Sequence, residues 1–318
     1  GGGGLGTERP VGPNVPRAWE RAGSGGPRPF TSWISYRRPQ GTCYLWESRH
    51  SRKGAGPVTA TGRAAPHTAE AESSPNPWLQ LWAPQRLAWW IALIFLVGSL
   101  LFIAGAAGSL APSAFGGQHR MAIYAESCYF LGALLYTVSV YGQVFESLNA
   151  DDRVGPDGAT HAPHRYRWFG FEPGKLSFWT PFVLLIGSLT FNYETTFAVG
   201  AKFELLPKAG LWWTSLIGSV LFLVSSLLQL AEAGHGYLKF DPRDVSCWVG
   251  LLFVLGSIGF IVGSLPGFPD TGFPTAENPA GASIVKVGFL AGGVAFLLGS
   301  YLMLPELFIQ LRSRDRRS

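Results

Sequence analysis

The chain has 318 residues, of which 47% are hydrophobic and only 14% are charged, and its formal net charge is +5. So few charged residues argue against an ordinary soluble domain and are typical of a membrane protein. The three cysteines, Cys43, Cys128 and Cys247, have neither the spacing of a disulfide framework nor that of a zinc site.

The first segment, residues 1–85, is rich in Gly, Pro, Arg and Ser and shows no apolar periodicity. Such a composition buries too little apolar surface to offset the entropy of ordering the chain, so we predict a disordered tail. The tail has no signal-peptide layout, and its basic residues lack the interleaved aromatics of a nucleic-acid module. Because the chain begins at Gly1 and its first methionine is Met121, it stays open whether residues 1–75 belong to the native protein.

Six apolar runs of about 20 residues or more follow, each long enough to cross a hydrocarbon core of about 30 Å. They cover roughly residues 87–110, 121–145, 177–199, 210–233, 245–266 and 283–309. Strands are excluded by the length of the runs, and their Gly, Ala and Ser content suits packed membrane helices. We therefore predict an all-α, polytopic membrane protein with six transmembrane helices, surrounded by the lipid bilayer.

Each run contains a glycine, then a small residue, two variable positions and Phe or Tyr. The six glycines are Gly98, Gly132, Gly187, Gly218, Gly256 and Gly292. The odd copies have a Trp eight residues earlier, at Trp90, Trp179 and Trp248, and the even copies have a Glu fourteen residues later, at Glu146, Glu232 and Glu306. The repeating unit is therefore a pair of helices. This pattern predicts three helical hairpins of common origin, at about 86–146, 175–233 and 244–309, within a domain of residues 86–310.

Helix geometry places these repeated Gly, Trp and Glu positions relative to the membrane. At about 1.5 Å and 100° per residue, the glycines lie near the midplane at helix contacts, and the Trp and Glu columns lie at one membrane face. The three Trp suit an aromatic belt at the interface. Gln143 and Gln229 are expected to face the bundle together with the three Glu, while Met303 takes the equivalent place in the third copy. The three Glu have two interpretations: they end their helices at the headgroups, or they form a ring of carboxylates at a cytoplasmic vestibule.

Three further charges lie deeper, in the predicted outer half of the membrane: Glu126, Glu194 and Lys286. A lone charge at that depth is costly, so a partner is expected, and Lys286 with Glu194 or Glu126 is the obvious pair. The alternatives are a polar functional site and a structural ion pair.

The orientation follows from the basic residues. Of the 25 Lys and Arg residues, 21 lie on one side of this topology, including those of the basic C-terminus at 311–318. Positive residues stay in the cytoplasm, so we predict a multi-pass protein of the cell membrane with both termini cytoplasmic.

The segments 95–106, 216–229 and 290–307, with their Gly-Ser-x-x-Phe cores, and the entry stretch at 165–179 resemble the YrhK-like membrane domain. The resemblance covers residues 86–310 and implies the helical fold. That family has no assigned activity, so the resemblance leaves function open.

We expect a structural, sensory or partner-binding protein, whose partner is a second copy of the chain or another membrane protein. The alternative is a small-solute or ion transporter or channel that uses Glu126, Glu194 and Lys286. No motif indicates an enzyme, a cofactor or a metal site. Substrate and oligomeric state cannot be read from these residues.

Overall fold

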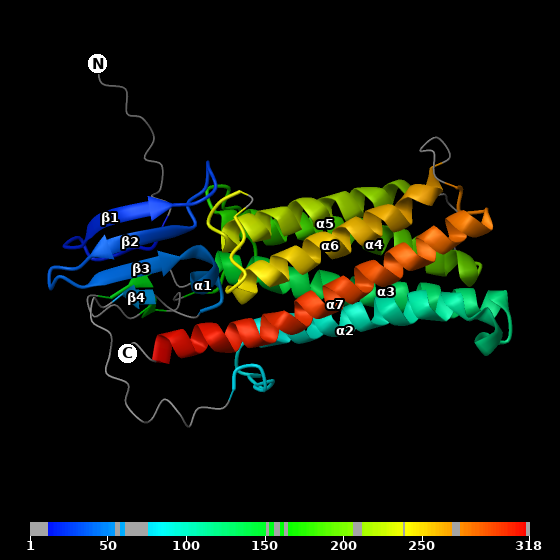
Figure 1. The fold of residues 1–318 in the computed structure, drawn as a ribbon, viewed down its shortest axis with the longest axis horizontal. Helices are drawn as coiled ribbons and strands as arrows, with labels where there is room; N and C mark the ends of the chain where they lie inside the picture. Colours follow the sequence, from blue (N-terminus) through cyan, green and yellow to red (C-terminus); the bar gives the residue numbers. More distant parts are fainter. Residues whose placement is uncertain are drawn as a thin grey trace, which may run out of the picture.

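The computed structural model describes residues 12–54, 58–60, 76–150, 153–155, 160–161, 165–205, 212–237, 239–268 and 274–315. Within these residues the chain forms a bundle of long helices with a small β-sheet at one end (Figure 1).

Six helices make up the bundle: α2 (Leu87–Leu110), α3 (Gln118–Leu148), α4 (Leu176–Lys202), α5 (Trp212–Ala233), α6 (Val245–Ser264) and α7 (Pro279–Asp315). All six are long and apolar enough to cross a membrane, as the six predicted spans require. Two short 3₁₀ helices lie beside them, η2 (Pro112–Phe115) between α2 and α3 and η3 (Leu265–Gly267) directly after α6.

The six helices form a closed ring. Each one packs against the helix before it and the helix after it, and α7 packs against α2. The helices of a pair are close enough for backbone contact at the repeated glycines. A Cβ built on Gly98 would lie 3.2 Å from the Gly132 carbonyl oxygen, and one built on Gly132 would lie 3.1 Å from the Gly98 carbonyl oxygen. The pair Gly256 with Gly292 repeats this geometry in both directions, and a Cβ built on Gly187 would lie 3.1 Å from the Gly218 carbonyl oxygen.

An aromatic layer fills the centre of the ring. It consists of the residues four positions after each glycine, all of them buried: Phe102, Tyr136, Phe191, Phe222, Phe260 and Phe296. Each glycine lies against the ring of its partner helix, as Gly256 does against Phe296. Rings also meet across pairs, and the Tyr136 and Phe222 centroids are 6.3 Å apart. The layer therefore separates the two ends of the bundle.

The N-terminal region forms a sheet, contrary to the predicted disordered tail. Strands β1 (Glu20–Gly25), β2 (Trp33–Arg37), β3 (Cys43–Glu47) and β4 (Val58–Ala60) pair antiparallel in this order, and helix α1 (Ser48–Arg52) follows β3. A second, two-stranded sheet joins β5 (Arg153–Val154) to β6 (Thr160–His161).

The prediction of disorder is wrong for residues 12–54 and 58–60, because two short strands alternate between buried and more exposed side chains. This period of two buries Ile34, Tyr36, Tyr44 and Trp46 on one face, where Trp19 and Val154 join them. The rest of the predicted tail up to residue 75 lies outside the described residues.

The sheet and the C-terminal part of α7 lie at the same end of the bundle, which we call the sheet end (Figure 1). The opposite end, where α4 ends and α5 begins, is called the cavity end.

Candidate functional site

At the sheet end, the three predicted carboxylates turn inward. The exposed fractions of Glu146, Glu232 and Glu306 are 9%, 1% and 2%. Glu146 and Glu232 lie near the ends of α3 and α5, and all three side chains are buried. Burial of three carboxylates is costly unless cations accompany them.

Helix α1 of the N-terminal region supplies those cations. Arg49 donates from Nε to Glu306 Oε1 at 2.6 Å and from Nη2 to Oε2 at 3.1 Å. The Lys53 Nζ lies 2.6 Å from Glu306 Oε2, and the Arg52 Nη2 lies 4.0 Å from Glu232 Oε2. Sequence reasoning did not connect these residues, because Arg49 and Glu306 are 257 positions apart.

We call these six residues the charge cluster: Arg49, Arg52, Lys53, Glu146, Glu232 and Glu306. It holds three basic and three acidic side chains, and Arg52 is the first of the cations that attract Glu146. Hydroxyl groups add to it, since the Ser48 hydroxyl donates to Glu232 at 2.7 Å and the Ser246 hydroxyl donates to Glu306 at 2.7 Å.

Burial and ion pairing have opposite effects on the pKa values of Arg49 and Lys53. Burial works to lower the pKa of Arg49, but the attraction of Glu306 and its hydrogen bonds outweigh burial and raise it. For Lys53 burial dominates and lowers the pKa to about 8, although Glu306 attracts the ammonium group. Arg49 is therefore a permanent charge, while Lys53 titrates close to physiological pH.

Beside the cluster lies a cavity of about 10 Å³, roughly the size of one water molecule. Gln143, Gln229 and Met303 line it together with the α1 cations. Each of these three residues lies eleven positions after the repeated glycine of its helix. The structure brings them together around this cavity.

Further contacts hold the sheet to the bundle. The Ser32 hydroxyl lies 2.9 Å from His235 Nδ1, and the Tyr237 hydroxyl donates to the Arg28 carbonyl oxygen at 2.8 Å. Both bundle residues lie in the connection between α5 and α6. The sheet is thus attached at a loop as well as through α1.

The three predicted interfacial tryptophans share one local arrangement at the sheet end. Each indole Nε1 donates to a proline carbonyl oxygen six residues earlier: Trp90 to Pro84, Trp179 to Pro173 and Trp248 to Pro242. Trp90 and Trp248 are 46% and 41% exposed on the outside of the bundle. The proline six residues before each Trp is a sequence signal that the motif analysis missed.

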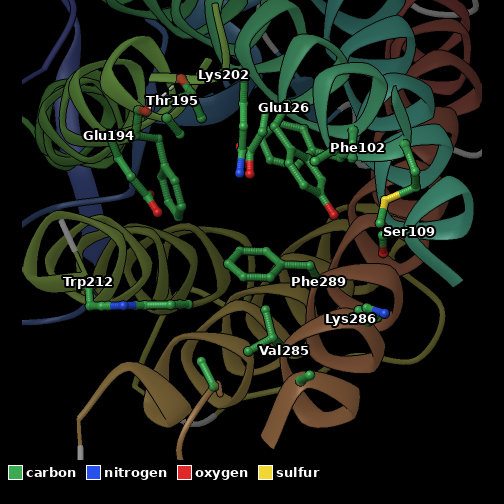
Figure 2. Close-up of a pocket in the computed structure, with 18 residues that line it drawn as sticks. Phe102, Ser109, Glu126, Glu194, Thr195, Lys202, Trp212, Val285, Lys286 and Phe289 are labelled. Carbon is green, nitrogen blue, oxygen red and sulfur yellow. Dashed lines mark hydrogen bonds between the residues drawn. The ribbon is translucent and has the colours of Figure 1, made fainter. Parts of the chain in front are cut away.

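The cavity end holds a second candidate site, a cavity of about 470 Å³ (Figure 2). Glu126, Glu194 and Lys286 all line it, so the structure brings the three predicted deep charges together. Lys202 lines it as well. Sequence reasoning missed Lys202 because it is the last residue of α4, beyond the apolar run.

The predicted pairing of Lys286 with Glu194 or Glu126 is not found among the ion pairs of the described residues. Instead Lys202 attracts Glu126 from the neighbouring helix, and Ser215 is the polar side chain that acts on Glu194. The Ser215 hydroxyl itself lies 2.9 Å from the Ser264 hydroxyl. Figure 2 shows the Lys286 amino group directed away from Glu194. The reason is helix order, because α7 lies beside α2 and α6, whereas α3 and α4 lie beside each other.

The cavity and the charge cluster are separated by the aromatic layer, and Phe102 and Phe191 of that layer line the cavity. Among the described residues, no group of three or more His, Cys, Asp or Glu is arranged to hold a metal ion. Comparison with protein-family models, with curated proteins and with solved structures found no match. The roles of both sites are therefore argued from their geometry.

Proposed function

We propose that this is a sensory or partner-binding protein of the cell membrane, with both termini in the cytoplasm, whose bundle holds and releases its own N-terminal sheet. We do not expect an enzyme. The observation that carries the proposal is the burial of three cations of α1 and its C-cap beside the bundle carboxylates, with ion pairs to Glu232 and Glu306. A structural sheet could rest on apolar contacts alone, whereas this contact places buried cations beside buried carboxylates.

Such a contact is suited to two-state behaviour. A buried ion pair contributes little when complete, but the loss of one partner leaves an unpaired charge and costs about 3–5 kcal/mol. Partial separation of α1 from the bundle is therefore unfavourable, so the sheet is either fully docked or released. A two-state element of this kind is what a ligand or partner can bias.

We further propose that the bundle consists of three hairpins of common origin, as in the YrhK-like domain it resembles. Three features support this: the close glycine contacts, the proline–tryptophan hydrogen bonds and the buried Glu of each even helix. A fourth feature holds in two pairs, where the Ser139 hydroxyl donates to the Ile91 carbonyl oxygen and the Ser225 hydroxyl donates to that of Thr180. The third pair has Gly299 at the serine position.

A transporter is the second candidate function. It is favoured by one observation, the position of a charged cavity and a charged cluster on opposite sides of a single aromatic layer. Passage of a solute would require the layer to open and α1 to leave the cluster. Glu126, Glu194 and Lys286 would then contact the solute first.

The test of the proposed function is a distance measurement in lipid vesicles. Spin labels are placed at Gln40, in the exposed β2–β3 turn, and at Arg243, in the exposed loop before α6, after Cys43, Cys128 and Cys247 are replaced. The otherwise unchanged protein should show one short distance and a minor, broad population. Arg49→Glu with Arg52→Glu should convert most molecules to the broad population. Glu277→Lys, an exposed change at the cavity end, is the matched control and should have no effect.

One narrow distance in both proteins would mean that the sheet is a fixed part of the structure, and the proposal of release would fail. Vesicle uptake of a small ammonium solute, measured beside these distances, separates the second candidate. Uptake that depends on Glu194 would favour transport.

A further inference from the structure

The cavity at the cavity end has the size and walls of a small-molecule site. Its volume of about 470 Å³ falls in the usual range of about 300–1,000 Å³ for such sites. Its walls are mostly apolar, and five aromatic rings reach it: Phe102, Tyr129, Phe191, Trp212 and Phe289. The rings come from α2, α3, α4, α5 and α7, so the pocket lies on the axis of the bundle.

The charges in this cavity are unevenly compensated. Lys202 attracts the Glu126 carboxylate electrostatically. Ser215 is the polar side chain that favours the Glu194 carboxylate, and no Lys, Arg or His of the described residues forms an ion pair with it. The nearby negative charge of Glu126 increases the need for a cation at Glu194.

The side-chain directions agree with this reading. Figure 2 shows the Glu194 carboxylate directed into the cavity, with the Phe289 ring reaching toward the same space. Trp212 lies one helical turn before Ser215 on α5, so its indole belongs to the same wall. The Lys286 amino group lies on the far side of the cavity and points away.

We propose that this cavity binds a small organic cation carrying an ammonium group. Glu194 is its counter-ion, and the faces of Trp212 and Phe289 contact the cation. An aromatic face carries negative electrostatic potential and attracts cations, most strongly in a desolvated site. This inference goes beyond the proposed function, because binding here requires neither release of the sheet nor transport.

An anionic ligand does not fit the same site. Lys202 is engaged by Glu126, and Lys286 points away from the cavity centre. An anion would meet the unpaired Glu194 carboxylate and the negative faces of the rings. The charge pattern of the cavity therefore selects cations.

The test is calorimetric titration of the full-length protein in detergent micelles with three probes of similar size. These are benzyltrimethylammonium as the cation, benzenesulfonate as the anion and benzyl alcohol as the neutral molecule. The cation should bind at least about tenfold more tightly than the other two. Glu194→Gln should weaken cation binding by about tenfold or more, because the amide leaves the shape but removes the charge. Trp212→Leu should weaken it by about three- to tenfold.

Glu277→Gln is the matched control, since it removes an exposed carboxylate at the same end, outside the cavity, and should leave binding unchanged. A cooperative melt establishes that each variant is folded, and Glu194→Asp replaces Glu194→Gln if the latter is not. The aspartate variant keeps the charge and should bind the cation more weakly than the parent, but still in preference to benzenesulfonate. Equal affinity for all three probes, an unchanged affinity in folded Glu194→Gln, or no binding of the cation to the folded parent would each overturn the proposal.

Discussion

The two ends of the bundle bury carboxylates in different ways. At the sheet end, Glu232 and Glu306 lie next to cations that the chain itself brings from α1. At the cavity end, Glu194 has Ser215 as its polar neighbour and an open cavity in front of it. The same helical scaffold thus satisfies its charges internally at one end and leaves a charge for a ligand at the other. The comparison shows that the role of a buried carboxylate depends on which group compensates its charge.

The largest expected effect is a difference in stability between the two ends. Glu306→Gln should lower the free energy of unfolding by about 3–5 kcal/mol, because Arg49 and Lys53 lose their counter-charge while they are buried. Glu194→Gln should be neutral or stabilising, because it removes a desolvated charge without a cation. Chemical denaturation of both variants in micelles measures the difference. Equal losses at the two ends would remove the basis of the comparison.

A double-mutant cycle sharpens this result. Combining Glu306→Gln with Arg49→Met should recover part of the loss, because the unpaired cation is removed together with its partner. Strict additivity of the two single changes would show that the pair is not coupled.

The next largest effect on stability is expected in the aromatic layer between the two ends. A Cβ at Gly256 would lie 2.4 Å from the Phe296 ring, so Gly256→Leu should push two helices apart and cost about 1–3 kcal/mol. Leu255→Phe, at the exposed neighbouring position, is the control and should change stability little. A Gly256→Leu variant as stable as the parent would contradict the close helix contact.

An effect of pH on docking is also expected at the sheet end. Burial lowers the pKa of Lys53 to about 8 from an ordinary value of 10.5. Between these values released α1 binds more protons than docked α1, so docking should strengthen as pH rises from about 8 to 10.5 and weaken as it falls. The spin-label distances would show this change as a shift in the two populations. Lys53→Met should flatten the profile, and a profile that keeps its slope in that variant would rule out Lys53 as the titrating group.

The bundle was predictable from the sequence because its signals are long or repeated. A span needs about 20 apolar residues, and the Gly, Trp and Glu columns recur at fixed spacing, so each copy supports the others. Glu306 could be placed at a membrane face in this way. Whether Glu306 ended its helix or faced inward could not be read from its own helix.

The sheet and the cations of α1 were not predictable in the same way. The strands Trp33–Arg37 and Cys43–Glu47 are five residues each. The Gly and Pro residues around them make the alternation of buried and exposed positions hard to recognise in the sequence. The role of Arg49 depends on a contact between distant segments, and a single sequence carries no periodic signal for such a contact. Lys202 was missed for a related reason, because only the packing of α3 against α4 brings it to Glu126.

The central claim is that α1 is held at the sheet end by charge compensation. Hydrogen exchange of the α1 backbone amides, Ser48 to Arg52, tests it most directly in a variant with Glu146, Glu232 and Glu306 all changed to Gln. We predict that exchange of these amides becomes at least about tenfold faster, while the amides of β2 and β3 keep the protection of their own sheet. Unchanged protection of α1 in the folded variant would contradict the claim, because the helix would then be held by other contacts.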